Sequence, residues 1–309
     1  MLRRALLASV GAMALTGAAL AADLPSRAPP PVFLPPPPVF SWTGLYVGIN
    51  AGGTWSSSNS VDTTATPIEP AFPTFETELA LSSALATTSV PVGSNGGFIG
   101  GGQIGYNYQF NNGFLNNSFV AGIEADIQGI AGSSGSSSVS GSGVPAGFPD
   151  ETITSTVSAS NRIDYLGTVR GRLGFLVTPT LLVYGTGGLA YGGVNSSAQI
   201  DQQNFAPAGS TFSAPFSSFG SINNSRVGWT AGGGGEWLFM PNWSLKVEYL
   251  YYDLGSVAYG LSPLTNAFTT TGDVVYSSAP FATTHFRGNI VRAGLNYHFT
   301  FPAPVVAKY

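Results

Sequence analysis

The sequence predicts an all-β fold, namely an eight-stranded antiparallel up-and-down transmembrane β-barrel in an outer membrane. Between Trp42 and Phe299, a segment of about ten residues with alternating apolar and polar side chains recurs eight times. Short turns and long polar connections join these segments alternately. Only 8% of the residues are charged, whereas soluble domains carry about 25%. A barrel surrounded by lipid needs few charged residues on its outer surface, which explains this low fraction. The alternative is a secreted β adhesin whose surface hydroxyls and amides meet water.

The first 41 residues are predicted to lie outside the barrel. Residues 1–22 read as a signal peptide, because Arg3 and Arg4 precede the apolar run Ala5–Leu15 and an Ala-Leu-Ala cleavage site. A signal anchor is less favoured, since that run is short. Residues 23–41 are rich in proline and predict an extended periplasmic leader, a spacer rather than a ligand for a proline-reading partner.

Seven of the eight segments in the barrel, residues 42–299, alternate with a clear period of two. In residues 119–128, Ile123 and its apolar neighbours face outward, whereas Glu124 and Asp126 face inward. The fifth segment is ambiguous because both of its faces are apolar, and its register stays unassigned. The clear segments span 43–51, 98–110, 119–128, 165–175, 227–237, 245–252 and 291–299, and the ambiguous one spans 181–192.

The connections predict the orientation. The long ones are rich in Ser, Thr, Asn, Gly and Pro, and the short ones carry tight-turn signals such as Thr178-Pro179-Thr180. Outer-membrane barrels keep long loops outside and both termini in the periplasm. Residues 131–142 and 207–224 look mobile, which leaves an adhesin role open beside plain solvated filler. The long connections are residues 56–96, 129–161, 194–224 and 256–283.

Six aromatic residues fall at predicted strand ends, where amphipathic rings favour the membrane interface. Ordinary packing at strand ends is the alternative. The predicted interface aromatics are Trp42, Trp237, Trp243 and Phe299 at the periplasmic end, and Trp55 and Trp229 at the outer end.

Charged side chains of opposite sign are predicted to meet inside the barrel. Four acids face four bases, so we expect a salt-bridged plug, since buried charges are tolerated when paired. The alternative is a small passive pore along inward glycines such as Gly44, Gly48, Gly228, Gly232 and Gly234. The predicted lumenal charges are Glu124, Asp126, Arg170, Arg172, Glu236, Lys246, Glu248 and Arg292.

The sequence contains no pattern for catalysis, for a metal or for a cofactor. The two histidines, His285 near the outer rim and His298 near the periplasmic end, are predicted to lie too far apart to share a metal or haem. We also expect neither histidine to lie near a second catalytic group on an adjacent strand. With no Cys, the chain has neither disulfides nor a lipid anchor on cysteine.

Eight segments carry a resemblance to a known family: 42–48, 101–107, 122–126, 166–174, 184–191, 246–251, 289–299 and 304–309. They resemble the small outer-membrane β-barrel family of Gram-negative bacteria, also described as porin family, OmpA-like or opacity-type barrels of rhizobium- and brucella-type envelopes. The resemblance covers almost all eight strands and none of the loops. It implies an envelope-structural, surface-exposed protein, sometimes with weak pore, adhesin or haem-binding roles.

The end of the chain departs from the family's pattern. The family's barrels usually end on an aromatic residue that the assembly machinery recognises, whereas ten residues (300–309) follow Phe299 here. Either Phe299 or Tyr309 could therefore be the assembly signal.

The predicted function is therefore that of an exported integral outer-membrane protein with a structural role in the envelope. The expected partners are outer-membrane lipid and lipopolysaccharide, together with the barrel-assembly machinery. A net charge of −4 without a basic patch excludes nucleic acid. A monomer is expected, and an oligomer stays open.

Overall fold

The computed structural model describes residues 41–57, 60–68, 70–93, 96–111, 118–205 and 215–299. The predicted signal peptide, the leader up to residue 40 and the tail at 300–309 lie outside these residues, as does the alternative assembly signal Tyr309.

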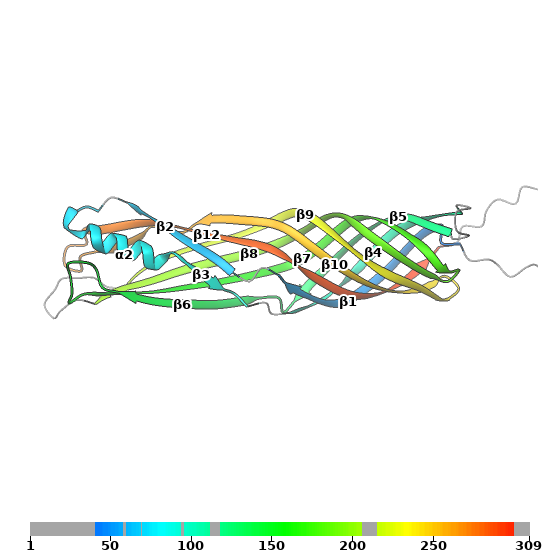
Figure 1. Cartoon of the computed structure of the whole chain (residues 1–309), viewed down its shortest axis with the longest axis horizontal. Helices are drawn as coiled ribbons and strands as arrows, with labels where there is room; N and C mark the ends of the chain where they lie inside the picture. The colour runs from blue at the N-terminus through cyan, green and yellow to red at the C-terminus, as the bar shows by residue number, and fades with distance from the viewer. Residues whose placement is uncertain are drawn as a thin grey trace, which may run out of the picture. The chain divides into compact units, whose positions relative to one another are not determined.

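Eight antiparallel strands close into a barrel, as the sequence predicts. Each strand of the ring pairs with the ring strands that precede and follow it in the chain, and β1 pairs with both β4 and β12, which closes the ring (Figure 1). The ring consists of β1 (Gly44–Ser56), β4 (Gly97–Asn111), β5 (Ser118–Ala131), β7 (Thr152–Thr178), β8 (Leu181–Phe205), β9 (Phe216–Met240), β10 (Trp243–Gly260) and β12 (Val274–His298).

The predicted inward and outward faces are those of the structure. Ile49, Ile123 and Val227 are each about two-thirds exposed on the outer wall, whereas residues of opposite parity are buried in the lumen. The ambiguous segment, now β8, also has a register. Leu182 and Ala190 face inward, whereas Val183 and Leu189 face outward. Both faces of β8 are apolar because its inward residues belong to apolar clusters of the lumen and its outward residues lie on the outer wall.

The strands continue far beyond the length needed to cross a membrane. A tilted transmembrane strand needs about 9–11 residues, but β7 has 27 residues, and β8, β9 and β12 have 25 each. The halves of these four strands that lie away from the turn between β7 and β8, together with the C-terminal end of β10, form what we call the extension. Four short strands complete its wall: β2 (Ser60–Ile68) and β11 (Leu264–Ala267) pair with β12, β3 (Thr88–Pro91) pairs with β2, and β6 (Gly135–Gly143) pairs with β7.

The prediction of long polar loops is therefore largely wrong. Residues 152–160 show the reason: Ile153, Val157 and Ala159 point inward and are buried, while Thr and Ser alternate with them on the wall. The segment therefore has the period of two that is typical of a strand, but Thr and Ser hydroxyls occupy the outward positions that apolar side chains occupy in the membrane. Residues 131–142, predicted to be mobile, lie mostly in β6, and 216–224 lie in β9. The rest of 207–224, up to residue 214, lies outside the described residues.

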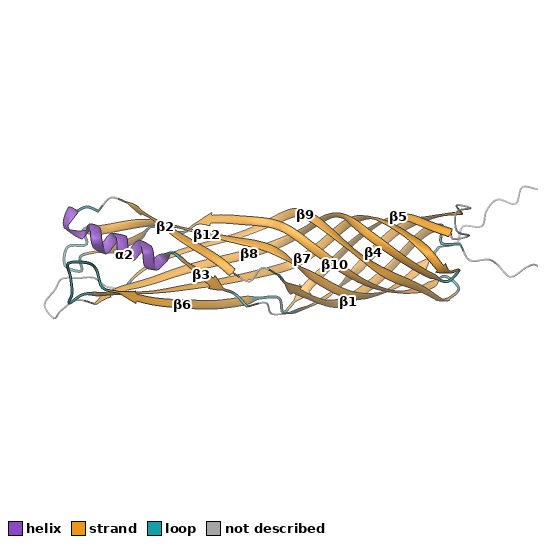
Figure 2. Cartoon of the chain, in the orientation of Figure 1, coloured by secondary structure: helices purple, strands orange, loops and turns teal. Residues whose placement is uncertain are grey.

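One helix enters the extension. The 3-10 turn η1 (Pro73–Phe75) leads into α2 (Glu76–Ala86), which contacts β2, β7 and β12 and buries Leu79 and Ala86 (Figure 2). No helix in the described ranges is long and apolar enough to cross a membrane.

The interior is filled in layers that can be followed along β7. Leu176 belongs to an apolar cluster at the end where β8 follows β7, which we call the turn end. Arg170 and Arg172 come next, then Ile163 and Leu166 in a second apolar cluster. Val157 belongs to a third cluster inside the extension. Charged groups are thus enclosed between apolar layers.

Candidate functional site

The eight predicted lumenal charges form one buried cluster, which we call the lumenal charge cluster. Strand register creates it: Glu124 lies opposite Arg170 across β5 and β7, and Glu248 lies opposite Arg292 across β10 and β12. Each of the eight side chains is at most 3% exposed. The inward orientation of all eight charges therefore follows from the period of two along the strands.

Two arginines connect the acids. The Arg170 guanidinium donates to Glu124 at 2.5 Å, to Asp126 at 3.0 Å and to Glu248 at 2.9 Å. Arg292 donates to Asp126 and to Glu248, both at 2.7 Å. Guanidinium forks suit such shared carboxylates, because several N–H donors lie in one plane.

Lys246 and Arg172 complete the cluster on the side of the turn end. The Lys246 Nζ atom donates to both Glu124 oxygens, at 2.8 and 2.9 Å. Arg172 donates to Glu236 at 2.7 Å and to the Tyr46 hydroxyl at 3.0 Å, and its guanidinium lies 4.0 Å from the Tyr184 ring centroid. Four acids and four bases thus compensate one another in a buried site, as buried charges require.

The inward glycines accommodate neighbouring side chains and do not leave a path. A Cβ on Gly48 would collide with Asn296, one on Gly232 with the Leu250 backbone, and one on Gly234 would come within 2.9 Å of the Tyr184 hydroxyl. A Cβ on Gly228 would collide with the Asp253 backbone carbonyl. The alternative of a polar channel along these glycines therefore has no support in the geometry.

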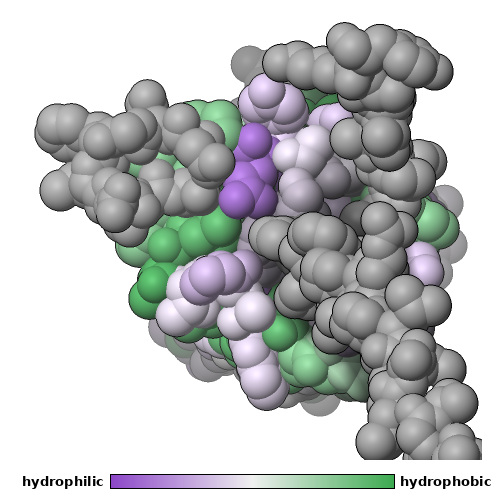
Figure 3. All heavy atoms as spheres, turned by 90° about the vertical axis from the view of Figure 1, so that its right-hand side faces the viewer, coloured by the Kyte–Doolittle hydropathy of each residue, from purple (hydrophilic) through white to green (hydrophobic). Residues whose placement is uncertain are grey.

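Five of the six predicted interface aromatics are exposed on the wall. Trp55, Trp229, Trp237, Trp243 and Phe299 are between 38% and 52% exposed. Figure 3 looks onto the turn end, where the described atoms show a polar patch within apolar surroundings.

Trp42 is the exception, and its prediction as a lipid-facing residue is wrong. It is 1% exposed; its indole Nε1 donates to the Pro179 carbonyl at 3.1 Å, and its ring packs edge-on against His298 at 5.6 Å. Trp42 precedes β1, so the period-two rule that orients strand residues does not apply to it. It covers the turn end of the lumen from inside.

His298 is not isolated from other polar groups, contrary to the prediction. Its Nε2 atom lies 2.8 Å from Ser244 Oγ and 3.3 Å from Glu236 Oε1, and Ser244 donates to that same carboxylate at 2.6 Å. A catalytic triad needs its base between nucleophile and acid, through two different ring nitrogens. Here one nitrogen faces both groups beneath Trp42, which makes this a buried structural contact.

His285 also has partners that the sequence reading missed. Its Nε2 lies 2.8 Å from Asp253 and its Nδ1 lies 3.1 Å from Ser256 Oγ. Asp253 additionally accepts from the Gly255 backbone N–H at 2.8 Å, across a β-bulge at which Gly255 has φ +79°. The residue order resembles a Ser–His–Asp relay, but Asp253 is engaged in holding the bulge. A β-bulge adds a residue to one strand and so shifts its pairing with the neighbouring strand. The alternation of apolar and polar residues does not reveal where such a bulge occurs.

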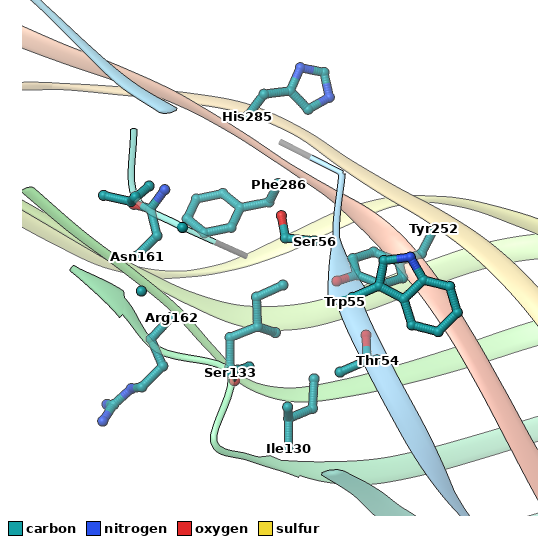
Figure 4. A pocket seen from close by; sticks show the side chains of 14 residues that line it. Thr54, Trp55, Ser56, Ile130, Ser133, Asn161, Arg162, Tyr252, His285 and Phe286 are labelled. Atoms are coloured by element: carbon teal, nitrogen blue, oxygen red, sulfur yellow. Dashed lines mark hydrogen bonds between the residues drawn. The ribbon is translucent and has the colours of Figure 1, made fainter. Parts of the chain in front are cut away.

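The wall is hollowed where the ring meets the extension, a level that we call the junction. β1, β3 and β5 all end there, and a small hollow that is open to solvent lies between their ends. Figure 4 shows Trp55 and Ser56 on one side, Ser133 and Asn161 on another, and Phe286 and Tyr252 toward the interior.

Inside the extension lies an acid pair that the sequence did not reveal. Glu78 on α2 is fully buried, and Glu151, just before β7, is 6% exposed. Burial, followed by the negative charge of Glu151, raises the pKa of Glu78 to about 8. The two residues are 73 positions apart in segments predicted to be loops (151 − 78 = 73), so no periodicity could bring them together.

A closed barrel with an apolar outer wall and a charged, filled interior defines an integral membrane barrel protein. The chain belongs to the family of the outer membrane protein beta-barrel domain, whose model matches residues 7–299. Its place is accordingly the cell outer membrane, as the sequence predicts.

Two relatives show the extent of the similarity. The chain is 36% identical to the 31 kDa outer-membrane immunogenic protein of Brucella melitensis over 300 residues, which covers 96% of this chain and all of the relative. It is 29% identical to the 22 kDa outer membrane protein of Rhizobium leguminosarum bv. viciae over 163 residues, or 52% of this chain and 56% of that protein.

Two solved structures show a limited similarity to the chain. Neisserial surface protein A matches with a TM-score of 0.30 and 13% identity, over 83% of this chain and 98% of the other. OprG of Pseudomonas aeruginosa matches with a TM-score of 0.35 and 10% identity, over 83% of this chain and 97% of the other.

Proposed function

We propose that this outer-membrane protein is a non-conducting structural barrel that displays its extension outside the cell. The observation that carries the proposal is the lumenal charge cluster, in which every acid has a base within 3.0 Å. An eight-stranded interior is just wide enough for its own side chains. Apolar layers on both sides of the cluster add to the barrier against ions.

Reconstitution into planar lipid bilayers tests this proposal. We expect the refolded protein to insert without steady conductance, whereas a general porin measured in parallel conducts. Incorporation is verified by recovering the folded protein from the membrane. Steady, ion-selective current from the wild-type barrel would contradict the proposal and favour the passive pore.

We also propose that lipid and the phosphates of lipopolysaccharide contact the junction. The described arginines outside the lumenal charge cluster all lie near this level, as their backbone neighbours show. The Arg287 carbonyl accepts a hydrogen bond from the Ser57 N–H. In the strand register, Arg226 lies opposite Gly192, and Arg162 lies opposite Asn195. Trp55 and Trp229 are exposed beside them. Aromatic rings and arginines together suit an interface of lipid and phosphate.

Phosphorylated and dephosphorylated lipid A distinguish phosphate contacts from general lipid binding. Native mass spectrometry of the refolded barrel should retain the phosphorylated form, and Arg226→Gln with Arg287→Gln should weaken that retention. Equal retention of both lipids by the wild type would rule out a role for the arginines.

For assembly we propose a monomer whose signal to the barrel-assembly machinery is Phe299. Phe299 directly follows β12, its N–H donates to the Leu45 carbonyl at 2.8 Å, and its side chain is 38% exposed. A chain that ends at Phe299 should assemble in the outer membrane like the full chain. Assembly that depends on the last ten residues would point to Tyr309.

We propose no catalytic role. The engagement of Asp253 in the bulge and the burial of Ser244 support this. A fluorophosphonate probe, which labels activated serines, should leave Ser256 unmodified in the refolded barrel. Two results together would contradict the absence of a catalytic role: labelling that disappears in Ser256→Ala, and lipase or protease activity of the refolded barrel.

A further inference from the structure

The interior of the extension contains a polar site that has no use in a simple structural wall. Glu78 projects from α2, and Glu151 directly precedes β7; their carboxyl groups lie within hydrogen-bond reach of each other. Glu78 has both carboxylate oxygens buried, and outside this pair no described donor reaches them. A buried carboxylate without a donor or a counter-charge is strongly unfavourable.

No basic side chain among the described residues compensates these acids. Four of the described bases belong to the lumenal charge cluster. The other three, Arg162, Arg226 and Arg287, lie near the junction, and none forms an ion pair with Glu78 or Glu151. Asn204 is the donor nearest to Glu151, at 3.5 Å from Oε2, which is a weak contact.

Two neutral polar side chains lie within electrostatic reach of the acids. Both side-chain polar atoms of Asn266 and the hydroxyl of Tyr276 are buried without a hydrogen bond of ordinary geometry. Asn266 and Tyr276 face each other across β11 and β12, and their side chains make a weak contact with each other. The negative charges of Glu78 and Glu151 act on the Tyr276 hydroxyl, so this group lies near the acids.

We propose that this site binds one oxygen-preferring divalent cation, for which Ca²⁺ is the probe, between Glu78 and Glu151. Ca²⁺ takes carboxylate, amide and hydroxyl oxygens in flexible geometry and completes its shell with water. The site offers oxygen ligands without His or Cys, which disfavours zinc and copper. The inference does not depend on whether the lumen conducts.

The cation would connect two parts of the extension. Glu78 belongs to α2 and Glu151 to the entry of β7, so one ion held by both carboxylates fastens the helix to the wall. Ser82 on the same helix already hydrogen-bonds Gln202 of β8 at 2.5 Å, and Gln202 donates back to the Ser82 carbonyl at 2.8 Å. The helix is thereby held in position for its carboxylate to meet Glu151.

Calorimetric titration of the refolded full chain in detergent micelles tests the proposal, after chelator has removed bound metal. We expect one Ca²⁺ per chain, and at least a tenfold loss of affinity in Glu78→Gln and in Glu151→Gln. Tb³⁺ provides a second readout, since tyrosine near a bound lanthanide sensitises its luminescence, and Glu78→Gln and Glu151→Gln should lose that luminescence together with Ca²⁺ binding.

Asp201→Asn is the matched control, because it removes one exposed carboxylate from β8 in the same extension. It should bind Ca²⁺ like the wild type, and retained heat-modifiable migration shows that each variant is folded. Three results would overturn the proposal: no binding by the wild type, equal binding by the wild type and Glu78→Gln, or binding lost equally in Asp201→Asn. Stability that responds to pH but not to Ca²⁺, Mg²⁺ or Tb³⁺ would mean that the acids share a proton instead.

Discussion

At the scale of single residues, the lumenal charge cluster makes the barrel most sensitive to loss of one partner. Arg170 donates to three carboxylates at once. Its removal leaves buried negative charge without compensation, and this penalty exceeds the cost of losing any single contact. An exposed ion pair such as Arg162 with Asp164, whose side chains are 57% and 41% exposed, carries no comparable penalty.

We therefore expect Arg170→Met to destabilise the folded barrel by about 3–5 kcal/mol, and Arg162→Met by at most about 1 kcal/mol. Urea unfolding of both variants in the same detergent measures the difference. Similar losses for the two substitutions would show that the cluster does not contribute through burial of its charges.

Close packing at one glycine gives a second test. A Cβ on Gly105 would overlap the Tyr46 ring, which is fixed because its hydroxyl donates to Glu124 at 2.6 Å. Gly129 has nothing within 4 Å of the same position. Gly105→Ala should cost about 1–3 kcal/mol and Gly129→Ala less than about 0.5 kcal/mol, measured by the same unfolding assay. Equal stability of the two variants would contradict this packing.

At the scale of elements, α2 brings an acid into the extension, and this makes stability depend on pH. The folded state holds the Glu78 proton more tightly than the unfolded chain does, with a pKa of about 8 against the ordinary value of 4.5. The folded state thus binds more protons between these values, so its stability is full below about pH 4.5 and is lost as pH rises toward about 8.

In chelator, wild-type stability should fall across this range by at most about 1.4 kcal/mol per pH unit. Glu78→Gln should remove most of that slope, because glutamine does not titrate. Thermal unfolding at pH 5 and pH 8, followed by circular dichroism, measures it. A slope that persists unchanged in the variant would assign the titration to another group.

The elements also show what alternation can and cannot predict. Arg170 and Glu248 could be placed because a strand crossing lipid alternates apolar and polar residues strictly. Thr154, Thr156 and Ser158 alternate with more buried residues too, but their hydroxyls face water, so the polar composition of this segment predicts a loop where the structure has a strand. Glu78 and Glu151 meet only through tertiary contacts between a helix and a distant strand, which no local pattern encodes.

At the scale of the whole molecule, closure of the ring determines the behaviour in detergent. Every neighbouring pair of ring strands is hydrogen-bonded, and β1 joins β12, so the ring has no free edge. A closed barrel resists detergent until it is heated, whereas a two-layer sandwich gains no such resistance from its topology.

The unheated protein should therefore migrate faster than the boiled protein in dodecyl sulfate gels, with β-type circular dichroism in detergent before heating and loss of it afterwards. The boiled sample serves as the unfolded reference. Identical migration of heated and unheated samples would be inconsistent with the closed ring.

The ends of β1, β3 and β5 at the junction have a consequence for how this architecture can change. Backbone continuity from the ring to the extension runs through β7, β8, β9, β10 and β12, while the remaining side is assembled from separate short strands. That side can be lengthened, shortened or exchanged without shifting the register of the ring. The molecule thus combines a closed membrane ring with a separately built panel, and grafting of foreign segments is best directed to that panel.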